Sequence, residues 1–131
     1  MKKVLSIVLF IVVLCSLTAC SEKSPIDIVK TGELSDYPGK PFAATMNKAF
    51  SDKNVKVTEN WEIITNQGSW KSILPDTAEA VRVTYSIEGE DGSFYFIVNM
   101  ENEKFEIYGA TQNGNEMSED ALASVLDDIF G

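Results

Sequence analysis

The chain has 131 residues, with 20 acidic against 11 basic side chains, no histidine and two cysteines. This size fits one small globular domain, and the formal charge of -9 argues against a nucleic-acid partner, because phosphate binding depends on clustered Lys and Arg. The absence of histidine removes the commonest general base and a frequent metal ligand, which argues against enzymes and metal sites that depend on it.

The N-terminus has the parts of a secretory signal. Met1-Lys2-Lys3 is basic, residues 4–14 are almost entirely apolar, and small residues follow before Cys20. Residues 4–19 number 16, whereas a membrane-spanning helix needs roughly 20. We therefore expect a signal peptide over residues 1–19 that is removed on export.

The end of this segment carries a more specific motif. Leu17-Thr18-Ala19-Cys20 resembles the lipobox of bacterial lipoproteins. The resemblance implies cleavage before Cys20, a diacylglyceryl group on its thiol, and a further acyl chain such as palmitate on the new N-terminus. Each buried methylene contributes about 0.8 kcal/mol, so two or three chains anchor a protein stably. The implied location is the bacterial cell envelope: the outer membrane facing the periplasm in a Gram-negative cell, and otherwise the outer face of the cell membrane.

Removal of the signal changes the composition of the chain. Residues 1–19 contain two lysines and no acid, so the remaining 112 residues carry 9 bases and 20 acids, a formal charge of -11. Cys15 is removed and Cys20 carries lipid, which leaves no thiol for a disulfide, a metal or a nucleophile. We expect residues 20–24 to form the lipidated cysteine with a short spacer, and residues 25–131 to form a single domain.

Hydrophobic periodicity predicts the elements of this domain. A first helix is expected over residues 41–51, where apolar residues recur at helical spacing. Alternation with a period of two predicts four strands, at residues 55–63, 81–87, 94–100 and 105–110. The residues Gly89-Glu90-Asp91-Gly92 read as the hairpin turn between the second and third of these strands.

The third strand and the C-terminus complete the prediction. The strand at residues 94–100 has apolar side chains on both faces, which places it at the centre of the sheet. Ser118 is a suitable N-cap for a C-terminal helix whose apolar stripe runs from Leu122 to Ile129. The fold class is therefore α+β: a helix, a four-stranded antiparallel sheet and a C-terminal helix, with the helices packed on one face of the sheet.

In its segment order and its lipid anchor the chain looks like the many small, single-domain bacterial envelope lipoproteins. Some proteins of that general architecture are assembly factors and others are secreted enzyme inhibitors. No motif in residues 25–131 selects one of these roles, and a shared fold does not by itself carry function.

Catalytic and metal-binding patterns are weak in this sequence. It has no Ser-x-x-Lys spacing in the mature chain and no Gly-x-Ser-x-Gly elbow. The turn Glu88 to Asp91 is rich in carboxylates that could hold Ca²⁺, but it lacks the order of an EF-hand loop and reads as a solvated hairpin tip. We therefore expect no cofactor, no metal and no enzymatic activity.

Three residues are candidates for contact with a partner. Trp70 and Ile73 lie in a polar connection, residues 66–75, and Tyr37 lies in the turn-rich segment 32–40. A loop tryptophan either recognises a partner or folds back over the sheet, whereas Trp61 is expected in the core because it falls on the same side of its strand as Val57 and Ile63.

The expected function follows from the anchor and the missing catalytic groups. The sequence predicts a membrane-anchored, non-enzymatic envelope lipoprotein that binds another envelope component, most simply a protein with a basic surface. One alternative is a lipid-anchored inhibitor or immunity-type protein that inserts the acidic turn 88–91 into an active site. A further alternative is a carboxylate-based hydrolase, which requires a pocket holding two acids.

Overall fold

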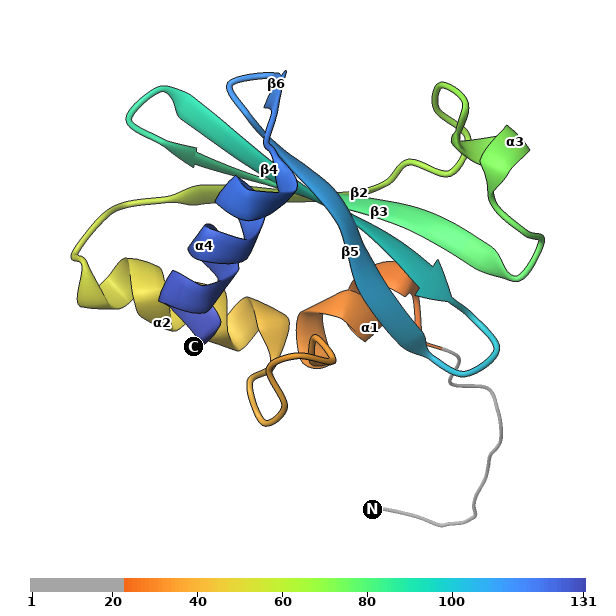
Figure 1. Cartoon of the computed structure of the whole chain (residues 1–131), viewed down its shortest axis with the longest axis horizontal. Helices are drawn as coiled ribbons and strands as arrows, with labels where there is room; N and C mark the ends of the chain where they lie inside the picture. The colour runs from red at the N-terminus through yellow and green to blue at the C-terminus, as the bar shows by residue number, and fades with distance from the viewer. Residues whose placement is uncertain (1–22) are drawn as a thin grey trace, which may run out of the picture.

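The computed structural model describes residues 23–131 (Figure 1). The predicted signal peptide, the lipobox and Cys20 lie outside the described residues. Within the part of the chain that is described, no helix is both long and apolar enough to cross a membrane. The elements in chain order are α1 (Pro25–Thr31), α2 (Phe42–Asp52), β2 (Thr58–Ile63), α3 (Trp70–Ile73), β3 (Ala78–Ile87), β4 (Glu90–Asn99), β5 (Lys104–Gln112), β6 (Asn115–Glu116) and α4 (Glu119–Phe130).

The strands form one antiparallel sheet in the order β2-β3-β4-β5-β6. The predicted α+β class is confirmed, and β4 is the central strand, as its two apolar faces predicted. The prediction of four strands is one too few, because the chain turns back at Asn113-Gly114 and adds the two-residue strand β6 to the end of β5. An Asn-Gly pair supplies the two positive φ angles that such a tight turn requires.

Two helices escape prediction because they are too short for a periodic signal. Helix α1 has seven residues, begins after the N-cap Ser24, whose hydroxyl accepts a hydrogen bond from the Asp27 backbone N–H at 3.2 Å, and buries Ile28 and Val29. Helix α3 has four residues and buries none of them. The longer helices are close to expectation, and the predicted Ser118 cap of α4 accepts a hydrogen bond from the Ala121 N–H at 3.1 Å.

Two strand boundaries correct the prediction. Strand β2 begins at Thr58 rather than at Val55, because the residues before it have no partner strand. The β3–β4 turn consists of Glu88 and Gly89, both with positive φ, and the pairing resumes at once with Ile87 opposite Glu90. The four-residue turn expected at residues 89–92 is therefore wrong: the turn spans residues 87–90, two residues earlier, and Gly92 belongs to β4.

Helices α1, α2 and α4 pack on the same face of the sheet (Figure 1). The centre of this core is Phe42, which begins α2 and is fully buried. Its ring centroid lies 5.0 Å from that of Phe96 and 5.4 Å from that of Phe130, so one side chain joins α2, the central strand and α4. Trp61 packs against the same core, as predicted.

Two side chains of the core carry a buried polar atom without a hydrogen-bond partner among the described residues, the indole N–H of Trp61 and the hydroxyl of Tyr85. Tyr85 is 4% exposed, and its hydroxyl has no hydrogen-bond partner among the described residues. Burial raises the pKa of this hydroxyl far above the usual tyrosine range, and the carboxylate of Glu59 raises it further. The folded chain therefore keeps the proton at a pH where the unfolded chain releases it.

Tyr85→Phe should consequently stabilise the protein and alter its response to alkali. At neutral pH we predict a gain of about 1 kcal/mol, because an unpartnered buried hydroxyl is removed. The unfolded tyrosine titrates near pH 10, whereas the folded one stays neutral to higher pH. Below about pH 10 both states are neutral and the titration of Tyr85 does not lower the free energy of unfolding. Above it, ionisation of the unfolded chain lowers the free energy of unfolding by up to about 1.4 kcal/mol per pH unit.

Urea unfolding followed by circular dichroism between pH 8 and pH 11 measures this difference. The free energy of unfolding should fall less steeply above pH 10 in Tyr85→Phe than in the wild type. Tyr108→Phe is the matched control, since Tyr108 is an exposed tyrosine on the same sheet. Equal slopes in the Tyr85 and Tyr108 variants would contradict the assignment.

Candidate functional site

The face of the sheet that points away from α1, α2 and α4 is called the open face here. Along β3 the buried Val81, Val83 and Tyr85 alternate with half-buried Arg82 and Thr84, which point to the open face. The strand register aligns the open-face residues in rows across the sheet. One row contains Glu62, Arg82, Tyr95 and Gly109, and the next contains Asn60, Thr84, Ser93 and Thr111.

Three aromatic side chains meet on the open face, and we call them the aromatic trio: Trp70, Tyr95 and Tyr108. The Trp70 ring lies edge-on to Tyr108, with 5.0 Å between the centroids, and nearly parallel to Tyr95 at 6.3 Å. Trp70 and Tyr95 are half-buried against each other, whereas Tyr108 is 59% exposed. The contacts within the trio thus fix the positions of its rings, and Tyr108 remains accessible to a partner.

Strand β5 has a β-bulge at Tyr108, which keeps the residues after it in register with the core. Phe96 pairs with Ile107, but the next residue back, Tyr95, pairs with Gly109, so that Tyr108 is an extra residue in β5. A bulge places two successive residues opposite one and redirects a side chain. Without it, strict alternation from the inward-facing Ile107 would leave Ala110 on the open face, whereas Ala110 is buried in the core.

Trp70 belongs to the trio because the loop that carries it is anchored at its start. Thr65 is buried; its hydroxyl donates to Glu79 Oε1 at 2.8 Å and accepts from the Ala80 N–H at 2.9 Å. The far end of the loop is held by a backbone hydrogen bond of 2.8 Å from Met100 N–H to the Thr77 carbonyl. Because both ends of the loop are held, the short helix α3 is positioned with Trp70 against Tyr95 and Tyr108 on the open face.

An ion pair borders the trio. Arg82 donates two hydrogen bonds to Glu62 Oε2, from Nη2 at 2.7 Å and from Nε at 3.1 Å. The bond to Glu62 raises the pKa of the Arg82 guanidinium, an effect that burial partly opposes. The guanidinium carbon also lies 6.0 Å from the centroid of the Tyr95 ring, within cation–π range. Arg82 is therefore charged, fixed in orientation and adjacent to the trio.

The structure brings two of the three sequence-predicted residues together and separates the third. Trp70 and Ile73 lie on α3, and the side chain of Ile73 is 55% exposed. Tyr37 lies on the helical side of the sheet, where its ring packs 5.7 Å from Phe130 and against the core. The three residues therefore do not form one surface.

Tyr95, Tyr108 and Arg82 were missed by sequence reasoning. Tyr95 lies on the second apolar face of the central strand, and a strand with two apolar faces gives no sign of whether the second face is covered. Tyr108 was assigned to a plain strand, and a bulge leaves little trace in the hydrophobic pattern. The available signal was an aromatic residue out of step with the inward-facing apolar residues in each of two neighbouring strands, Tyr95 between Phe94 and Phe96, and Tyr108 after Ile107.

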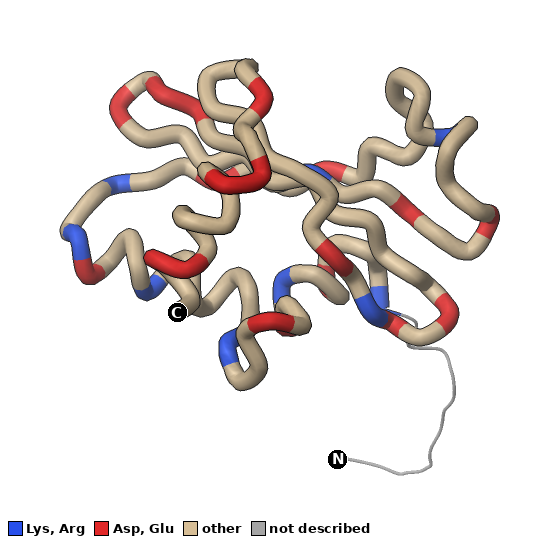
Figure 2. The backbone as a smooth tube through the Cα atoms, viewed as in Figure 1, with Lys and Arg blue, Asp and Glu red and all other residues tan. Residues whose placement is uncertain are grey.

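The carboxylates are distributed over the surface. Figure 2 shows acidic residues at the tip of the β3–β4 hairpin and at the start of α4. Every Asp and Glu of residues 23–131 is at least partly exposed. In this same part of the chain no three His, Cys, Asp or Glu side chains gather as a metal site would require, and the turn 88–91 is no exception.

The chemistry of the open face is read from its own residues, because a fold shared with other proteins does not determine what a surface binds. Comparison with known proteins does not assign the chain to a family, because it matches no protein-family model, no curated protein and no solved structure.

Proposed function

We propose that this chain is a lipid-anchored, non-enzymatic binding domain of the bacterial cell envelope, and that the open face holds a protein partner. The observation that carries the proposal is the aromatic trio beside Arg82 on a sheet face that α1, α2 and α4 leave uncovered. Trp, Tyr and Arg are the residue types that dominate the energetic centres of protein interfaces.

The geometry of the open face suits a pre-organised interface. Its side chains stand on paired strands, and Arg82 and Trp70 are already held by Glu62 and by Tyr95. Ordering free side chains costs about 0.5–1.5 kcal/mol each on binding, and a fixed platform avoids much of that cost. The exposed ring of Tyr108 and the side chain of Ile73 supply apolar area to be buried.

The net charge of the domain indicates what kind of surface the partner presents. The chain without residues 1–19 carries 9 bases and 20 acids. Complementary charge steers association and disfavours partners of the same sign. The expected partner is therefore an envelope protein that presents a basic patch around an apolar centre.

The expected anchor would keep the domain near the membrane. Ser24 caps α1, so residues 21–23 separate the lipidated Cys20 from the first helix. A chain of this length extends at most about 14 Å. Confinement of both proteins to one surface raises their effective concentration, so a modest direct affinity is sufficient.

Site-specific photocrosslinking in intact cells tests the proposal. A photoreactive residue at Tyr108 should capture an envelope protein, and the same residue at Ala123, an exposed position on α4, should not. Cys20→Ser should release the protein from the membrane fraction and greatly reduce the Tyr108 adduct, because the lipid acceptor is lost.

The other outcomes are equally informative. Equal capture from both positions, or none from Tyr108, would contradict the open face as the interface. Capture from Glu90 at the hairpin tip instead, with an enzyme as the product, would favour the inhibitor alternative. Membrane association of Cys20→Ser through lipid would overturn the anchor.

A further inference from the structure

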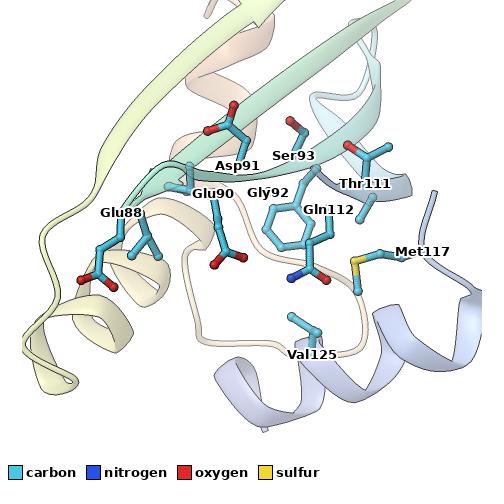
Figure 3. Close-up of a pocket in the computed structure, with 13 residues that line it drawn as sticks. Glu88, Glu90, Asp91, Gly92, Ser93, Thr111, Gln112, Met117 and Val125 are labelled. Carbon is cyan, nitrogen blue, oxygen red and sulfur yellow. The ribbon is translucent and has the colours of Figure 1, made fainter. Parts of the chain in front are cut away.

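A cavity of 370 Å³ lies on the helical side of the sheet, between the end of the β3–β4 hairpin, β5 and α4 (Figure 3). This size is within the range of small-molecule sites. The cavity is on the opposite side of the sheet from the aromatic trio. A ligand bound there would be distinct from the protein partner proposed for the open face.

The cavity exists because a glycine occupies a strand position where its neighbours carry side chains. Gly92 in β4 pairs with Tyr85 on one side and with Gln112 on the other, on the face that bears the core. A Cβ atom at Gly92 would approach only the Thr111 carbonyl oxygen, at 4.0 Å. Met117 and Val125 form the opposite wall, and the space between remains open.

The lining is apolar inside and acidic at the mouth. Ile87, Phe94, Met117 and Val125 supply apolar surface, and Glu88, Glu90 and Asp91 are the charged residues of the lining, which includes no Lys or Arg. In Figure 3 the side chains of Glu90 and Gln112 point toward Met117 and Val125, whereas those of Asp91, Ser93 and Thr111 point to the other side of the sheet.

We propose that this cavity binds a small molecule with an apolar chain that ends in a primary ammonium group. The chain would lie over Gly92 against Met117 and Val125, and the ammonium would meet the carboxylates of Glu88 and Glu90. The Gln112 side-chain carbonyl would accept a further hydrogen bond from it. An anionic ligand of the same length would meet the same two carboxylates and be repelled.

The turn at the mouth provides a variant that changes charge without harming the fold. Glu88 and Gly89 have φ angles of 52° and 84°, nearly the same as the 51° and 83° of Asn113 and Gly114 in the next hairpin. Asn is the favoured first residue of this turn type, and a residue such as Glu is strained there. Glu88→Asn should therefore remove a carboxylate while retaining or improving stability.

Titration of the purified chain with n-hexylammonium, with hexanol and with hexanoate tests the proposal. The NMR signals of the Met117 and Val125 methyl groups should shift saturably with hexylammonium. We expect hexanol to bind about fivefold more weakly and hexanoate at least about tenfold more weakly, the difference that a partly exposed ion pair provides. Glu88→Asn combined with Glu90→Gln should abolish the preference of the site for the amine over the alcohol.

Two strand glycines form a matched pair for the control. Gly92→Val fills the cavity and should weaken hexylammonium binding by at least about tenfold, since the space for the chain is lost. Gly109→Val adds the same side chain on the open face, where nothing lies within 4 Å, and should leave this binding unchanged. Circular dichroism confirms that both variants fold, and Gly92→Ala replaces Gly92→Val if the latter does not.

The results separate this proposal from the function proposed above. Equal affinity for the amine and the carboxylate, or unchanged binding in the Gly92 variant, would overturn the ammonium site. Crosslinking from Tyr108 does not depend on either result, because Gly92 faces away from the open face. Loss of the Tyr108 adduct with retention of ammonium binding would leave the cavity standing and remove the open-face partner.

Discussion

Phe42→Ala is expected to lower the free energy of unfolding by about 3–5 kcal/mol, the usual cost of truncating a fully buried phenylalanine. The ring is 0% exposed and joins α2 to the central strand and to α4. It also contacts Phe94 and Trp61 edge-on, at 5.8 and 6.3 Å between centroids. Small domains have stabilities of about 5–15 kcal/mol in total, so this single change would remove a large share of the free energy of unfolding.

Urea unfolding followed by circular dichroism measures the effect. Phe42→Leu is the matched control, because it retains most of the buried volume and should cost less than about 1.5 kcal/mol. The expected absence of a disulfide makes the test direct, since no crosslink would limit the unfolded chain. A loss below 1 kcal/mol for Phe42→Ala would show that Phe42 is not the centre of the core.

Trp70→Ala is expected to weaken binding of the open-face partner by at least about 30-fold, equivalent to 2 kcal/mol or more at an interface hot spot. The indole forms the contacts of α3 with Tyr95 and Tyr108, and the rest of α3 buries no residue. The fold should therefore lose about 1 kcal/mol or less, the worth of an aromatic contact at the surface.

Affinity for the protein captured from Tyr108, measured by calorimetry or surface plasmon resonance, provides the readout. Tyr37→Phe is the control: it retains the packing on Phe130 and lies on the other side of the sheet, so it should leave the affinity unchanged. Ile73→Ala, on the same short helix as Trp70, should have a smaller effect than Trp70→Ala. Equal affinity for the wild type and Trp70→Ala would remove the aromatic trio from the interface.

The trio should also respond as a unit. Trp70 and Tyr108 are in contact, so the losses in affinity from Trp70→Ala and Tyr108→Ala should not add, and the coupling energy should be about 0.5–3 kcal/mol. This cycle compares binding free energies among four proteins and does not depend on the absolute affinity.

Much of the fold was predictable because it rests on local signals. Periodic apolar residues marked α2, α4 and the long strands, and the Ser118 cap was correct in detail. The elements that escaped prediction, α1, α3 and β6, are two to seven residues long. Such segments are stabilised by the residues they pack against rather than by their own sequence pattern.

The candidate site was predictable only in part. Trp70 and Ile73 stood out as apolar residues in a polar connection, and they do lie together on α3. Tyr37 stood out for the same reason, but its ring packs against Phe130, and sequence reasoning does not distinguish a loop aromatic that faces solvent from one that covers a core. The cavity over Gly92 was hidden by placing that glycine in a turn.

The amino-acid sequence by itself determined the composition, the charge, the expected lipid anchor and the α+β class, because each depends on residues that are close together in the chain. The tertiary structure decided which residues share a surface. The bulge at Tyr108, the anchoring of the α3 loop by Thr65 and Glu79, and the space over Gly92 all arise from contacts between segments that are not adjacent in the chain. A shift of one residue in strand register moves a side chain from one face of a sheet to the other, and only the paired strands establish that register.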